Sequence, residues 1–260
     1  MGEEKGLTRD QKCSAIFVLC MKMAEFHNSL RRDFTEKAYR RPLGSRKTAT
    51  VLCFAKGSKT FYAALHLYEG HFHEDTAILA RSLVNIAINV RYFRSAPNDE
   101  LAERFLRYEA IERERMAERW GLPLTLEQKQ ETEVAAKEAR ALFNYGPEGK
   151  GWSGIPIEQM AKSFPKEMYQ MFYRYLSGFE HSSPVSLRSF IAEDADGRIR
   201  IADEPDSQGR HRDIIYALFT FAAYLTTELV QECIPDRETD LGNLNSEFQR
   251  IMRPTDGTAA

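Results

Sequence analysis

The fold is decided by residues 212–233, which read RDIIYALFTFAAYLTTELVQEC. Apolar side chains point in nearly every direction around a helix of this sequence, so the segment predicts a helix that is buried on all sides. Its uninterrupted apolar part, residues 214–227, ends at Glu228. This part is too short to span a bilayer, which needs about 20 apolar residues. We therefore expect this helix at the centre of a helical core.

Other segments with helical periodicity precede it in the chain. Their apolar residues recur at steps of three and four, and Pro42, Gly44, Gly70 and Pro97 separate the segments. The expected helices lie at about 8–34, 45–70, 74–95, 99–120, 126–143, 157–162 and 166–181. Residues 189–201 instead alternate polar and apolar side chains around Asp196-Gly197, a dipeptide typical of hairpin turns. The sequence thus predicts an all-α fold, a multi-helix bundle with one small β-hairpin at about 189–201.

A chain of 260 residues is long enough to bury a substantial core. We expect one helical domain over residues 1–252, with its core at about 65–233 and an N-terminal helical pair at 8–65 packed on it. Residues 253–260 are expected to form a disordered tail, because proline and small polar residues dominate there.

The net charge and the absence of known motifs argue against several classes of function. Lys and Arg number 36 against 38 Asp and Glu, so the net charge favours neither nucleic acid nor a membrane as the partner. The sequence has no Walker loop, no Gly-x-Gly-x-x-Gly and no Gly-x-Ser-x-Gly. Nucleotide hydrolysis, dinucleotide redox chemistry and serine-esterase chemistry therefore lack their usual motifs.

Cysteine and histidine spacing bears on metals and on the compartment. The four cysteines, Cys13, Cys20, Cys53 and Cys233, lack ligand spacing and are typical of buried, reduced thiols. The corner at residues 66–74 carries His and Glu side chains, but their spacing matches no established ligand pattern. The first residues are polar and do not resemble a secretory signal. We expect a cytoplasmic protein with no metal, no cofactor and no membrane partner.

Positive charge is concentrated in one segment, residues 31–59, which holds nine basic and two acidic side chains. Clustered positive charge beside a neutral body is what a phosphate-binding surface needs, because each contact releases condensed counterions. We predict an RNA-binding surface there, at Arg40, Arg41, Arg46 and Lys47. The alternative is a solvated loop whose charges are balanced by acidic neighbours.

The sharpest constellation is the stretch from Arg174 through Ser177 to His181. Steps of three, four and seven residues return to nearly the same direction on a helix, so the three side chains share one face. A proton-exchanging His beside a permanent cation is a minimal set for cleaving RNA, so the three are candidate catalytic residues. In the alternative, His181 caps the end of the helix and Arg174 pairs with an acidic neighbour.

A second polar stripe consists of Arg81, Asn85 and Asn89, at four-residue steps among apolar neighbours. Asn is unfavourable in helix interiors, and burying it without hydrogen-bond partners costs free energy. We therefore expect the stripe to face specific polar partners. We predict that it forms, with Tyr173, the wall of the site that holds Arg174, Ser177 and His181. A structural hydrogen-bond network between helices is the alternative.

Three motifs together resemble a bacterial helical family of unknown function. They are Ala80-Arg81-Ser82-Leu83, residues 151–161 with the sequence GWSGIPIEQMA, and Tyr173-Arg174-Tyr175-Leu176-Ser177 with His181-Ser182-Ser183. The resemblance covers about residues 65–230. That family typically has Glu four residues after the Arg, whereas this chain has Asn85.

The spacing Arg174, six residues, His181 is similar to the signature of HEPN domains. HEPN domains are helical bundles, often dimeric, and many are metal-independent ribonucleases of toxin–antitoxin and phage-defence systems. The resemblance implies catalytic roles for Arg174 and His181, RNA as a partner, a homodimer and a regulatory protein partner. A typical HEPN domain is shorter than this chain.

Two hypotheses from different classes follow. In the first, the protein is an HEPN-like metal-independent ribonuclease or RNA-binding effector. In the second, it is a non-catalytic helical module that binds a protein or small-molecule partner, and the same residues form a structural polar cluster.

Overall fold

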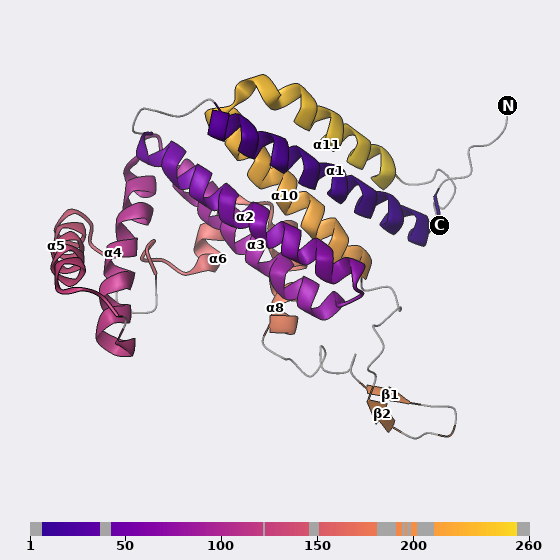
Figure 1. Cartoon of the computed structure of the whole chain (residues 1–260). Coiled ribbons are helices and arrows are strands. Elements are labelled where there is room, and N and C mark those ends of the chain that lie inside the picture. Colours follow the sequence, from indigo (N-terminus) through magenta and orange to yellow (C-terminus); the bar gives the residue numbers. More distant parts are fainter. Residues whose placement is uncertain are drawn as a thin grey trace. The chain divides into compact units, whose positions relative to one another are not determined.

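A computed structural model describes residues 7–36, 43–121, 123–145, 151–180, 191–193, 196, 199–201 and 211–253 (Figure 1). The chain divides into two compact units. The first unit comprises Met1–Arg40, Cys53–Ala87 and Lys166–Ala260, and the second comprises Arg41–Leu52 and Ile88–Pro165. The expected single domain over residues 1–252 stays a prediction, and residues 254–260 of the expected tail lie outside the described residues.

Long helices form the first unit. They are α1 (Arg9–Glu36), most of α2 (Ser45–Glu69), most of α3 (His73–Arg94), α10 (His211–Cys233) and α11 (Glu238–Met252), with a 3₁₀ turn, η4 (Pro235–Arg237), before α11. Helices α1, α10 and α11 contact one another and run side by side in Figure 1. A shorter helical segment is built from α7 (Lys166–Met168), the π-helical turn η2 (Tyr169–Arg174) and α8 (Tyr175–Glu180).

Helix α10 is the most apolar helix of the first unit, as its sequence predicts. Ile214, Ala217, Phe219 and Val230 lie on different sides of it, and each is at most 1% exposed. The helix is long and apolar enough to cross a membrane by composition, but 72% of its most apolar window is buried inside the protein. The prediction of a core helix is confirmed.

A buried histidine joins α1 to α10. His27 is 1% exposed, its ring contacts Phe54 and Phe61 of α2, and its Nε2 lies 2.7 Å from Thr226 Oγ1. Thr226 donates its hydroxyl proton to the Ala222 carbonyl oxygen at 2.6 Å, so His27 Nε2 carries the proton that the threonine oxygen accepts. Burial lowers the pKa of His27 from 6.5 to about 3, and the ring is therefore neutral.

Helices α2 and α10 approach closely at a glycine. A Cβ atom on Gly57 would lie 2.6 Å from Leu225 Cδ1 and 3.7 Å from Leu83 Cδ2. Any larger residue would have to displace a buried leucine. Gly57 therefore permits the close packing that covers this face of α10.

The second unit is built around a helical hairpin, α4 (Glu100–Trp120) and α5 (Leu126–Leu142), which contact each other along their length. Thr125 and Gln128 form a reciprocal capping box at the start of α5. The unit also holds α6 (Ile157–Met160), the 3₁₀ turn η1 (Ala161–Ser163), the start of α2 and the end of α3.

Trp152 anchors the loop before α6. Its indole is 8% exposed and packs against Phe105 and Tyr92, and its backbone carbonyl accepts a 2.8 Å hydrogen bond from Arg104 Nε. The indole N–H donates to Asn89 Oδ1 at 2.8 Å. An aromatic anchor of this kind fixes the turns at residues 151–155.

The fold-class prediction is confirmed in its all-α class and wrong in its hairpin. The predicted hairpin over residues 189–201 is not seen at that length among the described residues. In the described part of the chain, the paired segments are three residues each, β1 (Ile191–Glu193) and β2 (Ile199–Ile201). An isolated two-stranded ladder is marginal in water, so the local turn signal did not decide the structure of the whole segment.

Candidate functional site

The candidate site lies on the segment that runs from α7 through η2 to α8. Its π-helical turn, Tyr169–Arg174, holds more residues per turn than an α-helix, and such turns occur frequently at functional sites. Within it the rings of Tyr169 and Tyr173 stack, with centroids 5.0 Å apart and planes inclined by 14°. The stacked pair stiffens the turn that precedes Ser177.

Arg81 of α3 contacts this segment at two hydroxyl groups. Its Nε donates to Ser177 Oγ at 2.9 Å, and its Nη2 donates to the Tyr173 hydroxyl at 3.2 Å. The guanidinium carbon also lies 5.0 Å from the centroid of the Tyr173 ring. Ser177 donates its own proton to the Tyr173 carbonyl oxygen at 2.5 Å, so its oxygen is oriented to accept from Arg81. Arg81 is only 9% exposed, which strengthens these charge-assisted bonds.

The predicted catalytic residues are placed differently from one another. Ser177 is half-buried against Arg81, and Arg174 is exposed on the same helical segment. His181 follows the last described residue of α8 and lies outside the described residues. The structure thus brings Ser177 and Tyr173 to Arg81, which precedes both of them by more than 90 residues in the sequence.

The asparagines of the polar stripe do not share one role. Asn85 is half-buried on α3, one turn after Arg81, within the first unit. Asn89 belongs to the second unit and accepts the indole hydrogen bond of Trp152. Asn89 therefore contacts the Trp152 loop, and its place in the wall of the site stays a prediction.

The predicted RNA-binding residues also differ from one another in their contacts and exposure. Arg46 Nε lies 3.3 Å from Asp99 Oδ1, and its Nη2 donates to the carbonyl oxygens of Ala96 and Asn98. Asp99 in turn accepts from the Arg46 backbone N–H at 3.3 Å and so caps the start of α2. Lys47 is exposed, while Arg40 and Arg41 lie outside the described residues. Arg46 thus contacts residues 96–99 whereas Lys47 is exposed, and RNA binding by this set stays a prediction.

Sequence reasoning missed one feature of the same basic segment. Arg31 and Arg32, near the end of α1, line a hollow together with Asn28. They had been counted only as part of a charged stretch. Their three- and four-residue spacing from Asn28 is the signal that could have singled them out.

The corner between α2 and α3 shows no sign of a metal site. His71 adopts a left-handed backbone with φ of 64°, and its ring meets that of His73 edge to face at 5.8 Å. Among the described residues, no group of three or more His, Cys, Asp and Glu side chains could hold a metal ion.

Comparison with known proteins finds a family model that matches part of the chain. A family model described as "Family of unknown function (DUF5677)" matches residues 47–199, which include Arg81, Trp152, Arg174 and Ser177. No curated protein and no solved structure gives a significant match to the chain. The matched region is more than half of the 260 residues, and it holds the Arg81–Ser177 contact described above. On this match, the chain belongs to the family of unknown function DUF5677.

Proposed function

We propose that this protein is an HEPN-like, metal-independent endoribonuclease of a bacterial toxin–antitoxin or phage-defence system, acting in the cytoplasm. Arg174 and His181 are its catalytic residues, and the polar surface around Ser177 receives the RNA. The observation that carries the proposal is the contact of the nearly buried Arg81 with Ser177 and Tyr173. This contact fixes the helical segment that bears Arg174, and catalysis needs groups held in a fixed geometry.

The proposed reaction uses the ribose of the substrate as nucleophile. The 2′-hydroxyl oxygen attacks the adjacent phosphorus and loses its proton, the bond from phosphorus to the 5′-oxygen breaks, and that oxygen gains a proton. The products are a 2′,3′-cyclic phosphate and a 5′-hydroxyl end. His181 exchanges protons with the hydroxyl or the leaving oxygen, and Arg174 stabilises the charge that develops on the phosphoryl oxygens.

Two partners belong to this proposal through the resemblance to HEPN domains. A homodimer would bring two copies of the Arg174 segment into one particle. A regulatory protein would hold the nuclease inactive until it is needed. Both remain proposals for this chain.

The experiment that tests the proposal is an RNA degradation assay with the full chain. His181→Ala should lower the cleavage rate by roughly 10²–10⁴-fold, the usual contribution of a positioned proton-transfer group. His66→Ala, which removes an exposed histidine of α2, is the matched control and should cleave as wild type does. EDTA should leave cleavage unchanged. Full activity in a well-folded His181→Ala protein would refute the assignment, and so would loss of activity in EDTA.

A second candidate function is favoured by exposed apolar side chains in the second unit. Trp120, at the end of α4, is 76% exposed, and Leu126, at the start of α5, is 75% exposed. Exposed tryptophan is frequent among residues that dominate protein–protein binding. A non-catalytic module that binds a protein would use this turn. In that case wild type would show no RNA cleavage, and Trp120→Ala would weaken binding to the partner.

A further inference from the structure

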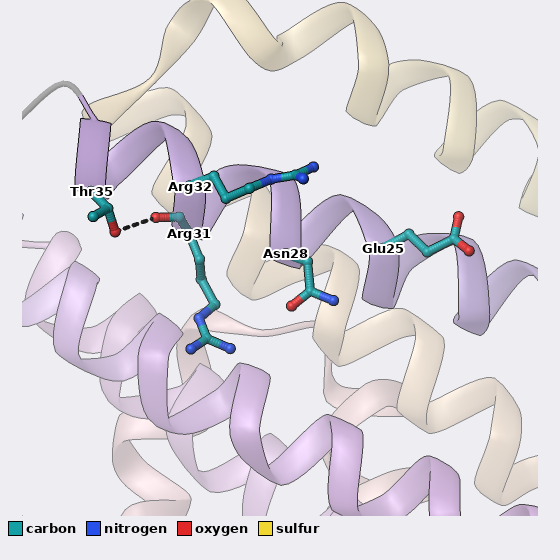
Figure 2. A pocket seen from close by; sticks show the side chains of 5 residues that line it. All are labelled: Glu25, Asn28, Arg31, Arg32 and Thr35. Atoms are coloured by element: carbon teal, nitrogen blue, oxygen red, sulfur yellow. Dashed lines mark hydrogen bonds between the residues drawn. The ribbon is translucent and has the colours of Figure 1, made fainter.

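A hollow of about 830 Å³ lies on α1, outside the Arg81–Ser177 site. Its described lining is Glu25, Asn28, Arg31, Arg32 and Thr35 (Figure 2). These positions are separated by steps of three and four residues or are neighbours, so they share one side of the helix. The volume falls within the range of small-molecule sites, about 300–1,000 Å³.

Two arginines give the hollow its charge. Neither the Arg31 nor the Arg32 guanidinium makes a hydrogen bond or an ion pair to any described residue. The acidic residue next to them, Asp33, is already paired with Arg237, whose Nη1 lies 3.5 Å from Asp33 Oδ2. Among the residues that the structure describes, these two adjacent cations therefore have no anionic partner.

The polar groups of the hollow converge near one side chain of α2. The Tyr62 hydroxyl donates to the Ala24 carbonyl oxygen. Burial raises the pKa of Tyr62, the positive charge of Arg31 lowers it, and the negative charge of Glu25 raises it. The nearby Asn28 side chain also lowers the pKa of Tyr62. Arg31, Asn28 and Glu25 are thus all close enough to one hydroxyl to act on it.

The hollow has two unlike ends. Figure 2 shows Arg31 and Asn28 pointing to the same side of α1, with Glu25 at the opposite end from Thr35. Six residues separate Glu25 from Arg31, a rise of about 9 Å along a helix. The planar fork of a guanidinium binds phosphate oxygens in pairs, whereas a carboxylate repels phosphate and accepts hydrogen bonds from hydroxyl or amino groups. A ligand that fits has phosphate at one end and hydrogen-bond donors at the other.

We propose that this hollow binds a nucleoside 5′-phosphate. Its phosphate meets the Arg31 guanidinium and the Asn28 amide, which point to the same side of α1, while Arg32 adds positive charge beside them (Figure 2). A sugar hydroxyl or base amino group donates to Glu25. The same chemistry is offered by a free nucleotide and by the 5′-phosphorylated end of an RNA. The inference does not depend on the ribonuclease proposal, because none of these residues belongs to the Arg174–His181 segment.

The first experiment is calorimetric titration of the full chain with matched probes. Adenosine monophosphate is compared with adenosine, and one short RNA is compared in its 5′-phosphorylated and 5′-hydroxyl forms. We expect the phosphorylated member of a pair to bind at least about tenfold more tightly, because hydrogen bonds between a guanidinium and a phosphate are charge-assisted and therefore stronger than neutral ones. Binding of adenosine monophosphate identifies a free nucleotide, and binding of the phosphorylated RNA alone identifies an RNA end. Equal binding within both pairs, or no binding by either phosphorylated probe, overturns the proposal.

The second experiment uses variants. The double substitution Arg31→Gln with Arg32→Gln should weaken binding of the phosphorylated probe at least about tenfold, at unchanged thermal stability because both side chains are exposed. Arg250→Gln with Arg253→Gln is the matched control, since it removes the same charge from exposed arginines at the end of α11. Glu25→Gln should weaken adenosine monophosphate binding without weakening binding of inorganic phosphate. Equal losses in the two double variants would show a general charge effect and overturn the site.

Discussion

At the scale of single residues, the structure separates side chains that bind neighbours from those that face solvent. Arg81 and Arg46 are both held by partners that are distant in the chain. Arg174 and Lys47 are exposed. Charge alone does not distinguish these cases, because the distinction depends on which hydroxyl, carboxylate or carbonyl lies within reach.

The neutral His27 makes stability depend on pH. Its pKa is about 3 in the folded protein and near 6.5 in the unfolded chain, so the unfolded state binds more protons between these values. Stability therefore falls as pH decreases from 6.5 toward 3. Between pH 7 and pH 5 we expect His27 to contribute a loss of about 2 kcal/mol.

Denaturant unfolding of wild type and His27→Gln at the two pH values measures this contribution. Gln can still donate a hydrogen bond to Thr226 but does not titrate, so the variant should lose about 2 kcal/mol less than wild type. The same pH dependence in both proteins would contradict a neutral, buried His27.

At the scale of elements, contacts between helices explain what the sequence could and could not predict. The central place of α10 follows from its composition, because a helix with apolar residues on all sides has no face for water. The contact between Arg81 and Ser177 agrees with the predicted neighbourhood of the two helical faces. The partner of Asn89 was not predictable, since Trp152 comes from a glycine-rich loop whose path follows no periodicity. The Arg46–Asp99 ion pair was not predicted either, because Asp99 follows a turn without helical periodicity. The length of the hairpin at 189–201 was overestimated from the single dipeptide Asp196-Gly197.

The contact of α2 with α10 is tested by Gly57→Ala. The added methyl group would meet Leu225 Cδ1 in a packed interior, and overpacking of this kind costs about 1–3 kcal/mol. Gly242→Ala in α11 is the matched control, because a Cβ there would have nothing within 4 Å. The control should be neutral or stabilising by up to about 1 kcal/mol, since alanine favours helix.

Thermal unfolding followed by circular dichroism compares the two variants. A melting temperature lowered in Gly57→Ala and not in Gly242→Ala supports the close approach of α2 and α10. Equal changes in melting temperature in the two variants would mean that Leu225 moves aside without a loss of stability.

At the scale of the whole molecule, a nearly neutral chain carries a strongly basic segment. Such a distribution directs a polyanion to one part of the surface without making the entire protein adhere to nucleic acid. The segment is not uniform, because Arg46 is held by Asp99 and two carbonyl oxygens while Lys47 is exposed.

The salt dependence of RNA binding separates these roles. Combined replacement of Arg40, Arg41 and Lys47 by Ala should weaken binding and reduce the slope of log affinity against log salt by about one unit per lost phosphate contact. Stability should hardly change in this variant. Arg46→Ala should instead lower stability by about 1–2 kcal/mol, because it leaves carbonyl groups and Asp99 without their donor. An unchanged slope in the triple variant would show that the segment is only a solvated loop.

The π-helical turn at Tyr169–Arg174 has a consequence for comparing sequences within the family. A π turn accommodates one residue more than the α turn it replaces, so deletion of one residue there can leave an uninterrupted helix. Because the wider turn absorbs the extra residue, the helix after the deletion would keep nearly the same orientation relative to α7. Ser177 would then still face Arg81, although its number in the relative would be lower by one. An alignment gap of one residue in this turn is therefore compatible with the same contact between the two residues in a relative.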